Sequence, residues 1–271
     1  MFYSTDKNDH GLPHDPFKAI VAPRPIGWIT SMSASGAINL APYSYFNGVH
    51  SRPPMVMFAS EGRKDSLAFI EETKEFVCNL ATWDLREHMN QTSAPYPRGT
   101  NELTEAGLTP AACRLVKTPR VAEAPCALEC KWLDTIELHD VDEKPVEGWV
   151  VIGRVVGVHI DERYIRNGLL DSAAMKPIAR GGYHDYSVLD KSFTMAADER
   201  CRDQSRLTGT WVPAPRYSMR YRSRDCPLHH TGVKHLRVRR RASNIVRRIL
   251  PGVSFPAQWR IERRPDRSYH G

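Results

Sequence analysis

Two long, mostly apolar stretches dominate the middle of the chain, at residues 126–138 and 148–160, and a short polar segment at 140–147 separates them. Parallel neighbouring strands need a connection of about a dozen residues or more, usually a helix. Because the segment at 140–147 is too short for that connection, the two stretches are predicted to pair as a long antiparallel hairpin. The second stretch is apolar at nearly every position, which predicts burial of both of its faces.

The other expected elements are short and follow one another through turns. A strand at 26–32, a turn signal at 33–36 and an extended pattern at 37–41 predict a second hairpin. Further strands are expected at 55–60 and 76–81, and short helices at 67–75 and from Asp84 onward. Short turns in place of crossover helices favour a mainly β antiparallel barrel over a doubly wound sheet.

The segment Ser60–Ser66 joins an expected strand to an expected helix and is the clearest candidate binding segment. Asp65 or Ser66 is a suitable N-cap for that helix. The free backbone amides, the positive end of the helix dipole and the cations Arg63 and Lys64 would meet where a phosphate group can bind. The alternative is a solvated loop with an ordinary helix cap.

Two more segments have the character of binding loops. In the segment 22–31, the rings of Pro23 and Pro25 fix the backbone just before the first strand. Residues 39–47 place small and polar side chains between aromatic ones just past a strand end, where backbone N–H and C=O groups can face the edge of a heterocycle. The alternatives are the start of an edge strand for the first segment, and a plain turn packed by Tyr43 and Phe46 for the second.

Taken together and in order, these segments resemble the flavin reductase-like, FMN-binding split-barrel family over residues 10–195. Any one motif is weakly specific, whereas the ordered set is specific. The motifs are the segments 23–31, 39–47, 64–66, 76–80, 89–95, 102–110, 125–130, 158–161 and 177–183.

The resemblance implies a Greek-key split barrel that forms a homodimer with FMN at the subunit interface. It also implies roles for single residues. Thr30 and Ser31 would line the flavin or its ribityl chain; Pro42, Tyr43, Ser44 and Asn47 would hold the ring edge; Ser60, Lys64, Asp65 and Ser66 would bind the phosphate; and Asn90 and Ser93 would lie near the site. Glu61 departs from the neutral residue expected beside a phosphate.

The implied activity is that of an FMN-dependent oxidoreductase of the flavin reductase type, with NAD(P)H as the reductant. The acceptor would be a flavin, another small molecule or a partner monooxygenase. A flavin carries its own hydride chemistry, so no catalytic side chain is predicted. Two alternatives stay open: a non-enzymatic FMN-binding protein or flavoredoxin-like electron carrier, and a nucleic-acid-associated protein that uses its basic C-terminal residues.

Cysteine and histidine usage adds few candidates. The six cysteines form no Cys-x-x-Cys pair, so a structural zinc site is not expected. The first residues lack the apolar core of a secretory signal, and no stretch approaches the roughly 20 apolar residues of a membrane span, so a cytoplasmic protein with reduced thiols is expected.

His159 is expected to be a core or interface histidine. Arg180 would either close over the site or lie in a surface turn.

Charge divides the chain unevenly. Residues 201–271 contain 17 Lys and Arg against 4 Asp and Glu, whereas residues 1–200 contain 21 against 27. The predicted organisation is an arm at 1–16, an FMN-binding domain at 17–200 and a basic extension at 201–271. The extension is expected to be disordered, because it lacks a persistent helical or strand period. A nucleic-acid-binding arm is less favoured, since its charge would gather on one face with interleaved aromatics.

Overall fold

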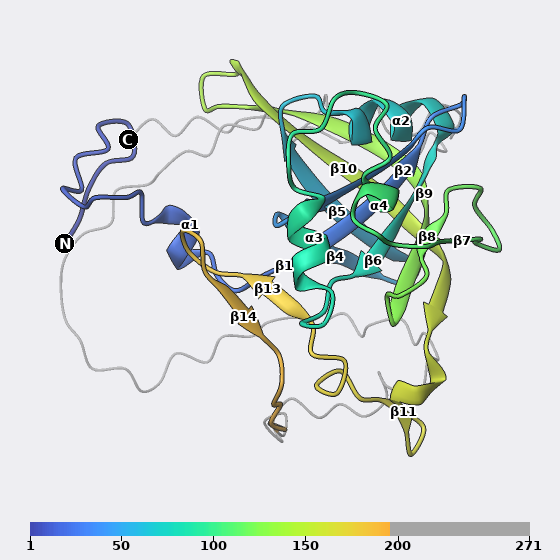
Figure 1. Ribbon diagram of the computed structural model, residues 1–271. Helices are drawn as coiled ribbons and strands as arrows, with labels where there is room; N and C mark the ends of the chain where they lie inside the picture. Colours follow the sequence, from blue (N-terminus) through green and yellow to red (C-terminus); the bar gives the residue numbers. More distant parts are fainter. Residues whose placement is uncertain (196–271) are drawn as a thin grey trace, which may run out of the picture. The chain divides into compact units, whose positions relative to one another are not determined.

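The two long stretches form the central hairpin of the computed structural model (Figure 1). Strand β9 spans Cys126–His139 and pairs antiparallel with β10, Pro145–Ile160, as the short connection predicts. The structure describes residues 1–195. The basic extension predicted at 201–271 therefore lies outside the described residues.

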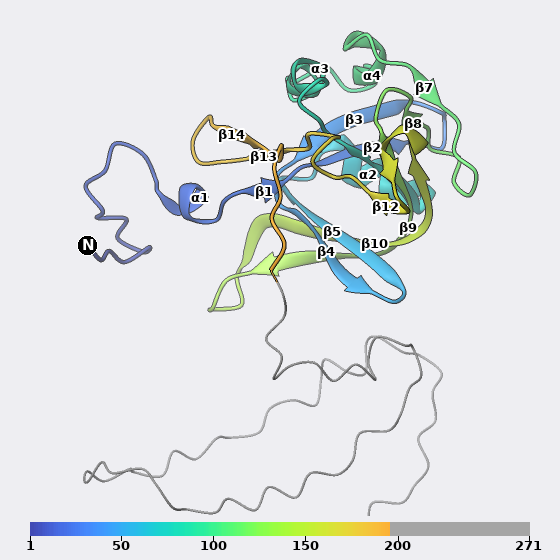
Figure 2. The same cartoon turned by 90° about the horizontal axis from the view of Figure 1, so that it is seen from below.

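The main sheet has seven antiparallel strands. The other five are β2 (Gly27–Met32), β3 (Ile38–Tyr43), β4 (Phe46–Ser51), β5 (Pro54–Glu61) and β6 (Glu75–Leu80). Their order across the sheet is β3-β2-β6-β9-β10-β5-β4. Only Ser44 and Tyr45 join the two edge strands, β3 and β4, so the sheet must curl until its edges meet at that end (Figure 2). The result is the expected mainly β split barrel, with a Greek-key connection from β5 to β6.

Burial along β10 differs from the sequence prediction. Val151 and Val155 are buried, but their neighbours are only partly covered, and Val158 is 58% exposed. The prediction that both faces of this strand are buried is therefore wrong. An antiparallel sheet can have one face exposed to water. Apolar side chains are common on protein surfaces, so valines on that face do not require other elements to pack over them.

Helices cover the barrel on two sides. They are α1 (Phe17–Ile20), α2 (Asp65–Thr73), α3 (Arg86–Gln91) and α4 (Glu102–Glu105), with a 3₁₀ turn at Glu162–Tyr164. Leu67 and Ile70 of α2 pack into the inner core with Phe58. Met89 of α3 and Leu103 of α4 belong to a second core with the β2 and β3 side chains that point the other way. No helix among residues 1–195 is long and apolar enough to cross a bilayer.

Small sheets complete the described chain. They are β1 (Arg24–Pro25) with β13 (Ile178–Arg180) and β14 (Tyr186–Val188), β7 (Pro110–Ala111) with β8 (Arg120–Val121), and β11 (Ile165–Arg166) with β12 (Leu169–Leu170). Buried Arg24 ties the first of these sheets to α1, because its guanidinium donates to the carbonyls of Gly181 (2.9 Å), Lys18 and Val21. Gly182 allows the close approach, since a Cβ there would lie 2.5 Å from that of Ala19.

Candidate functional site

A cavity of about 450 Å³ lies along the edge strand β3, between the start of α2 and the segment that joins α3 to α4. Six of the predicted site residues line it: Pro42, Tyr43, Lys64, Asp65, Ser66 and Ser93. Thr92–Tyr96 and Arg98 form the opposite side, and Arg98 lies 3.4 Å from the Asp65 carboxylate.

The N-terminus of α2 opens into this cavity. Lys64 is the N-cap, and among residues 1–195 no side chain caps the helix, so the predicted cap at Asp65 or Ser66 is wrong. The backbone turns into the helix at Gly62, whose φ of +85° suits glycine. The amides of Asp65 and Ser66 have no hydrogen-bond acceptor in the described chain. Uncapped amides at the positive end of a helix dipole form an anion-binding site.

Behind the helix start lies a wall of buried polar groups. In the amide orientation that satisfies both of its ends, Asn39 accepts from the Ser66 hydroxyl (2.9 Å) and donates to Glu102 (3.2 Å). Glu102 also accepts from the Leu40 amide (3.1 Å), and its burial raises the pKa of this carboxyl. Asn39 and Glu102 were not predicted as cavity residues, although both belong to the family-like segments 39–47 and 102–110.

Tyr43 completes this wall. Burial raises the pKa of its phenol, while the hydroxyls of Ser66 and Ser60 beside it act in the opposite direction. The Tyr43 hydroxyl makes no hydrogen bond of good geometry within the described residues. A buried polar atom without a partner costs free energy, and a ligand that supplies the partner recovers it.

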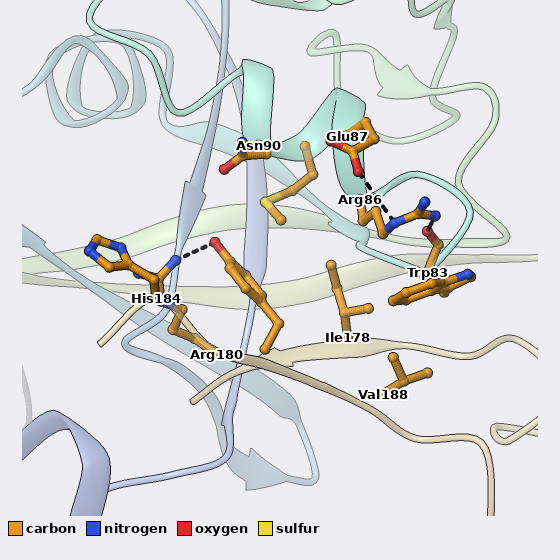
Figure 3. Close-up of a pocket in the computed structure, with 10 residues that line it drawn as sticks. Trp83, Arg86, Glu87, Asn90, Ile178, Arg180, His184 and Val188 are labelled. Atoms are coloured by element: carbon orange, nitrogen blue, oxygen red, sulfur yellow. Dashed lines mark hydrogen bonds and ion pairs between the residues drawn. The ribbon is translucent and has the colours of Figure 1, made fainter. Parts of the chain in front are cut away.

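The cavity continues past β3 into two further hollows. The first, of about 160 Å³, shares Pro42 and Ser93 with it and also contains the predicted residues Ser44 and Asn90. The second, of about 390 Å³, shares Asn90 and Arg180 with the first and lies between α3 and the β13–β14 hairpin (Figure 3). Shared lining residues make one groove that runs from the start of α2 to that hairpin.

Two predicted residues of β2 lie inside the protein, away from the described cavities. Thr30 is fully buried, and its hydroxyl accepts from the Asn79 amide (2.8 Å). Ser31 is also fully buried, and its hydroxyl has no partner among residues 1–195. Ser31 pairs with Asn39 of β3 in the strand register, which places it next to the polar wall behind the cavity.

Two more predicted residues also lie outside the described cavities. Buried Ser60 donates to the carbonyl of Gly62 (2.8 Å), so it shapes the turn into α2. Asn47 is exposed on β4, where its side chain accepts from the next backbone amide (2.8 Å). Glu61, the residue that departs from the family pattern, is exposed and pairs with Lys18 at 3.4 Å; it does not line the described cavities.

His159 lies in a separate cluster. Its Nε2 is 2.6 Å from Glu129, and potential metal-ligand atoms of these two residues and Cys113 lie within 4.8 Å of one another. The Glu129 carboxylate also accepts three backbone N–H bonds from residues 114–116. Burial would raise the pKa of Glu129, but these bonds and His159 hold it below its usual range. With these contacts in place, Glu129 anchors a loop to the barrel, and His159 is a partly buried histidine whose Nε2 is partnered by this carboxylate.

Comparison with known proteins assigns the family. The sequence profile described as "Flavin reductase like domain" matches residues 21–176. The chain belongs to this family. The family expected from the ordered motifs is thus confirmed.

Individual relatives agree with this assignment. An uncharacterized protein of Bacillus subtilis, YwrF, is 34% identical over 181 residues, which are 65% of this chain and 88% of the relative. The crystal structure of nitrilotriacetate monooxygenase component B from Bacillus cereus is 29% identical, with a TM-score of 0.66 over 72% of this chain and 98% of the other. A Shewanella frigidimarina protein with a split barrel domain shares the fold, with a TM-score of 0.62 at 21% identity over 73% of this chain and 100% of the other. The family supports flavin binding and a flavin-related oxidoreductase function.

Proposed function

We propose that this chain binds FMN in the groove along β3 and acts as an oxidoreductase of the flavin reductase type, with NAD(P)H as the reductant. The observation that carries the proposal is the uncapped start of α2, which opens into a cavity lined by six residues that the family resemblance assigns to FMN. A phosphate ester is the natural ligand of such a helix end.

The residues present fit FMN at the phosphate end. Lys64 would supply a cation, and the free amides of Asp65 and Ser66 would supply two hydrogen bonds. The unpartnered Tyr43 hydroxyl is a further polar atom that a ligand can satisfy. Arg98 adds a second positive charge at the same cavity, partly compensated by Asp65.

The rest of the groove fits a planar ring. Pro42 and Ser44 stand at the end of edge strand β3, where backbone N–H and C=O groups are available to the edge of a heterocycle. Asn90 and Ser93 face them from the end of α3. A bound flavin supplies the hydride and electron transfer, so this chain needs to bind and orient it and to limit access of water.

The Bacillus cereus relative is a component of a monooxygenase, which favours a partner protein that uses the reducing equivalents from this chain. We therefore propose that the acceptor is a flavin or a partner monooxygenase. A flavoredoxin-like carrier, which does not oxidise NAD(P)H, is the alternative. Anaerobic addition of NADH or NADPH separates the two, because bleaching of the flavin absorption is expected only for the reductase.

We also propose that the chain works as a homodimer. Large apolar side chains are exposed on the described surface, among them Ile20 (74%), Leu169 (74%) and Val158 (58%). A two-fold dimer is the commonest way to cover such a surface. Sedimentation of the FMN-loaded protein is expected to give twice the chain mass, and a stable loaded monomer would refute the dimer.

The central claim is tested by absorption spectroscopy. A flavin spectrum is expected on purification or after reconstitution with FMN, with tighter binding of FMN than of riboflavin because only FMN carries the phosphate. A folded protein with no measurable affinity for FMN would contradict the proposed function.

A further inference from the structure

The hollow between α3 and the β13–β14 hairpin differs in chemistry from the phosphate end. Its volume is about 390 Å³, and its floor is apolar, with Met89 and Ile178 buried in the cores beneath it. Trp83 and Tyr186 supply aromatic surface at its sides. Figure 3 shows Trp83, Ile178 and Val188 on one side of this space and Arg180 and His184 on the other.

Two guanidinium groups border this apolar space. Arg86 lies over the Trp83 ring, 4.0 Å from its centroid, and donates to the Trp83 carbonyl (2.8 Å). Arg180 lies over the Tyr186 ring at 4.5 Å and donates to the hydroxyl of that tyrosine and to the Tyr183 carbonyl (2.6 Å). A guanidinium has five N–H donors, so each arginine keeps donors for a ligand.

The acid that lines the hollow does not cancel this charge. The Glu87 side chain is 78% exposed, and its carboxylate lies 3.4 Å from Arg86. The attraction between the charges of such an exposed pair is weak. His184, also in the lining, carries no negative charge. The net charge of the side chains around the hollow therefore favours binding of an anion. The planar guanidinium group, which can donate two parallel hydrogen bonds, favours a carboxylate.

We propose that this hollow is a subsite for a second ligand of the groove, and that the ligand is a small aromatic ring carrying a carboxylate. The apolar floor and aromatic sides take the ring, and Arg86 beside Trp83 takes the acid, while Arg180 on the opposite side of the hollow supplies a second positive charge (Figure 3). The proposal rests on the proposed function for its place in the reaction, because Asn90 and Arg180 connect the hollow to the flavin end of the groove. A volume near the lower limit for small-molecule sites, about 300 Å³, suits one ring better than a dinucleotide.

The test is a binding measurement that does not depend on turnover. Isothermal titration calorimetry with 4-hydroxybenzoate, and with its uncharged methyl ester, is run on the protein with and without saturating FMN. We expect the acid to bind and the ester to bind about tenfold more weakly, because the charge-assisted hydrogen bond to Arg86 is lost.

Three variants test whether Arg86 and Glu87 act on the bound acid. Arg86→Gln is expected to weaken the acid about tenfold, whereas Glu87→Gln is expected to tighten it by up to about fivefold through loss of an opposing charge. Both residues line this hollow but not the other two, so their FMN affinity should match that of the wild type. Arg166→Gln, which removes an exposed arginine paired with Asp171, is the matched control and should change neither ligand.

The outcomes separate this inference from the proposed function. Equal binding of acid and ester, no acid binding by folded protein, or an unchanged acid affinity in Arg86→Gln would overturn the subsite. If FMN binds and the acid does not, the subsite alone fails. If the acid binds with the expected variant pattern but FMN does not, the aromatic-acid site stands and the proposed function fails.

Discussion

The two ends of the groove recognise anions by different means. At the start of α2 the donors are backbone amides, fixed by the helix and backed by the buried groups of Tyr43 and Asn39. At the β13–β14 hairpin the donors are arginine side chains on an apolar floor. The first end is assembled from residues 39–102, whereas the second joins residues 83–90 to residues 178–188. A local assembly and a long-range assembly should therefore respond to different substitutions.

The largest expected effect is on the long-range end. Arg24 is buried and holds the hairpin through the Gly181 carbonyl (2.9 Å) and α1 through the carbonyls of Lys18 and Val21. Arg24→Met removes these charge-assisted bonds, each worth about 1.5–3 kcal/mol. Amide hydrogen exchange over residues 178–188 is expected to speed up by about a hundredfold, with little change in α2.

A matched control keeps this result specific. Arg166→Met removes an arginine that is exposed and pairs only with Asp171 in the described chain, so its exchange pattern should equal that of the wild type. If Arg24→Met accelerates exchange in α2 as much as in the hairpin, the two ends are one cooperative unit and the contrast between them is false.

The next effect in size concerns the phosphate end. Lys64→Ala removes a cation from the start of α2 and touches nothing at the ring end. FMN is expected to bind about tenfold more weakly or worse, whereas riboflavin affinity stays unchanged. Fluorescence titration of both flavins measures this. Lys144→Ala, which removes an exposed lysine that pairs with Asp142 and lines none of the groove, is the control. Equal losses for both flavins would show that Lys64 does not contact phosphate.

Local sequence predicted the strand, loop and helix that form the start of α2, but not the details of its cavity. Gly62 and the polar residues after it mark the entry to α2, and apolar periodicity marks the helix itself. The cap was predicted wrongly because Asp and Ser usually cap helices with their side chains, whereas Lys64 leaves these amides open here. Glu102 was missed because its closeness to Asn39 depends on how α4 packs beside β3.

The other end could not be read from local pattern. Nothing near Arg180 in the sequence indicates that Arg86 lies across the same hollow. The two are brought together by contacts between distant segments: β13 pairs with β1, and the Ile178 amide donates to the Ala81 carbonyl (3.0 Å) shortly before α3. The strand β4 was missed for a similar reason: its residues pair with β5 but carry no alternation, and five of the six are exposed. For β10 the prediction failed by expecting too much burial. Its valine-rich composition suggested that both faces are covered, but Val158 is exposed in this chain.

A smaller effect is expected from Glu102, whose pKa is raised by burial. Above that pKa its carboxylate opposes the phosphate in the same cavity, and below it the opposition disappears. Wild-type affinity for FMN should therefore rise, relative to Glu102→Gln, as the pH falls through the pKa of Glu102. At high pH the variant should bind FMN up to about fivefold tighter than the wild type. The variant-to-wild-type ratio cancels the ionisation of FMN itself, and for riboflavin that ratio should stay flat across the pH range.

The smallest effect is expected from removal of the C-terminal residues. Among residues 1–195, those that line the groove lie between Ile26 and Val188, and residues 201–271 contribute 17 basic against 4 acidic side chains. At physiological salt, exposed charges are screened beyond about 8 Å, so this excess charge should not reach the ligands. Truncation after Arg200 is expected to leave the affinities for FMN and 4-hydroxybenzoate within about twofold of the full chain, while any salt-sensitive binding to DNA or RNA is lost with the arginines. A truncated protein that folds but no longer binds FMN would place part of the phosphate end in the removed residues, and the contrast between a local and a long-range end would have to be redrawn around them.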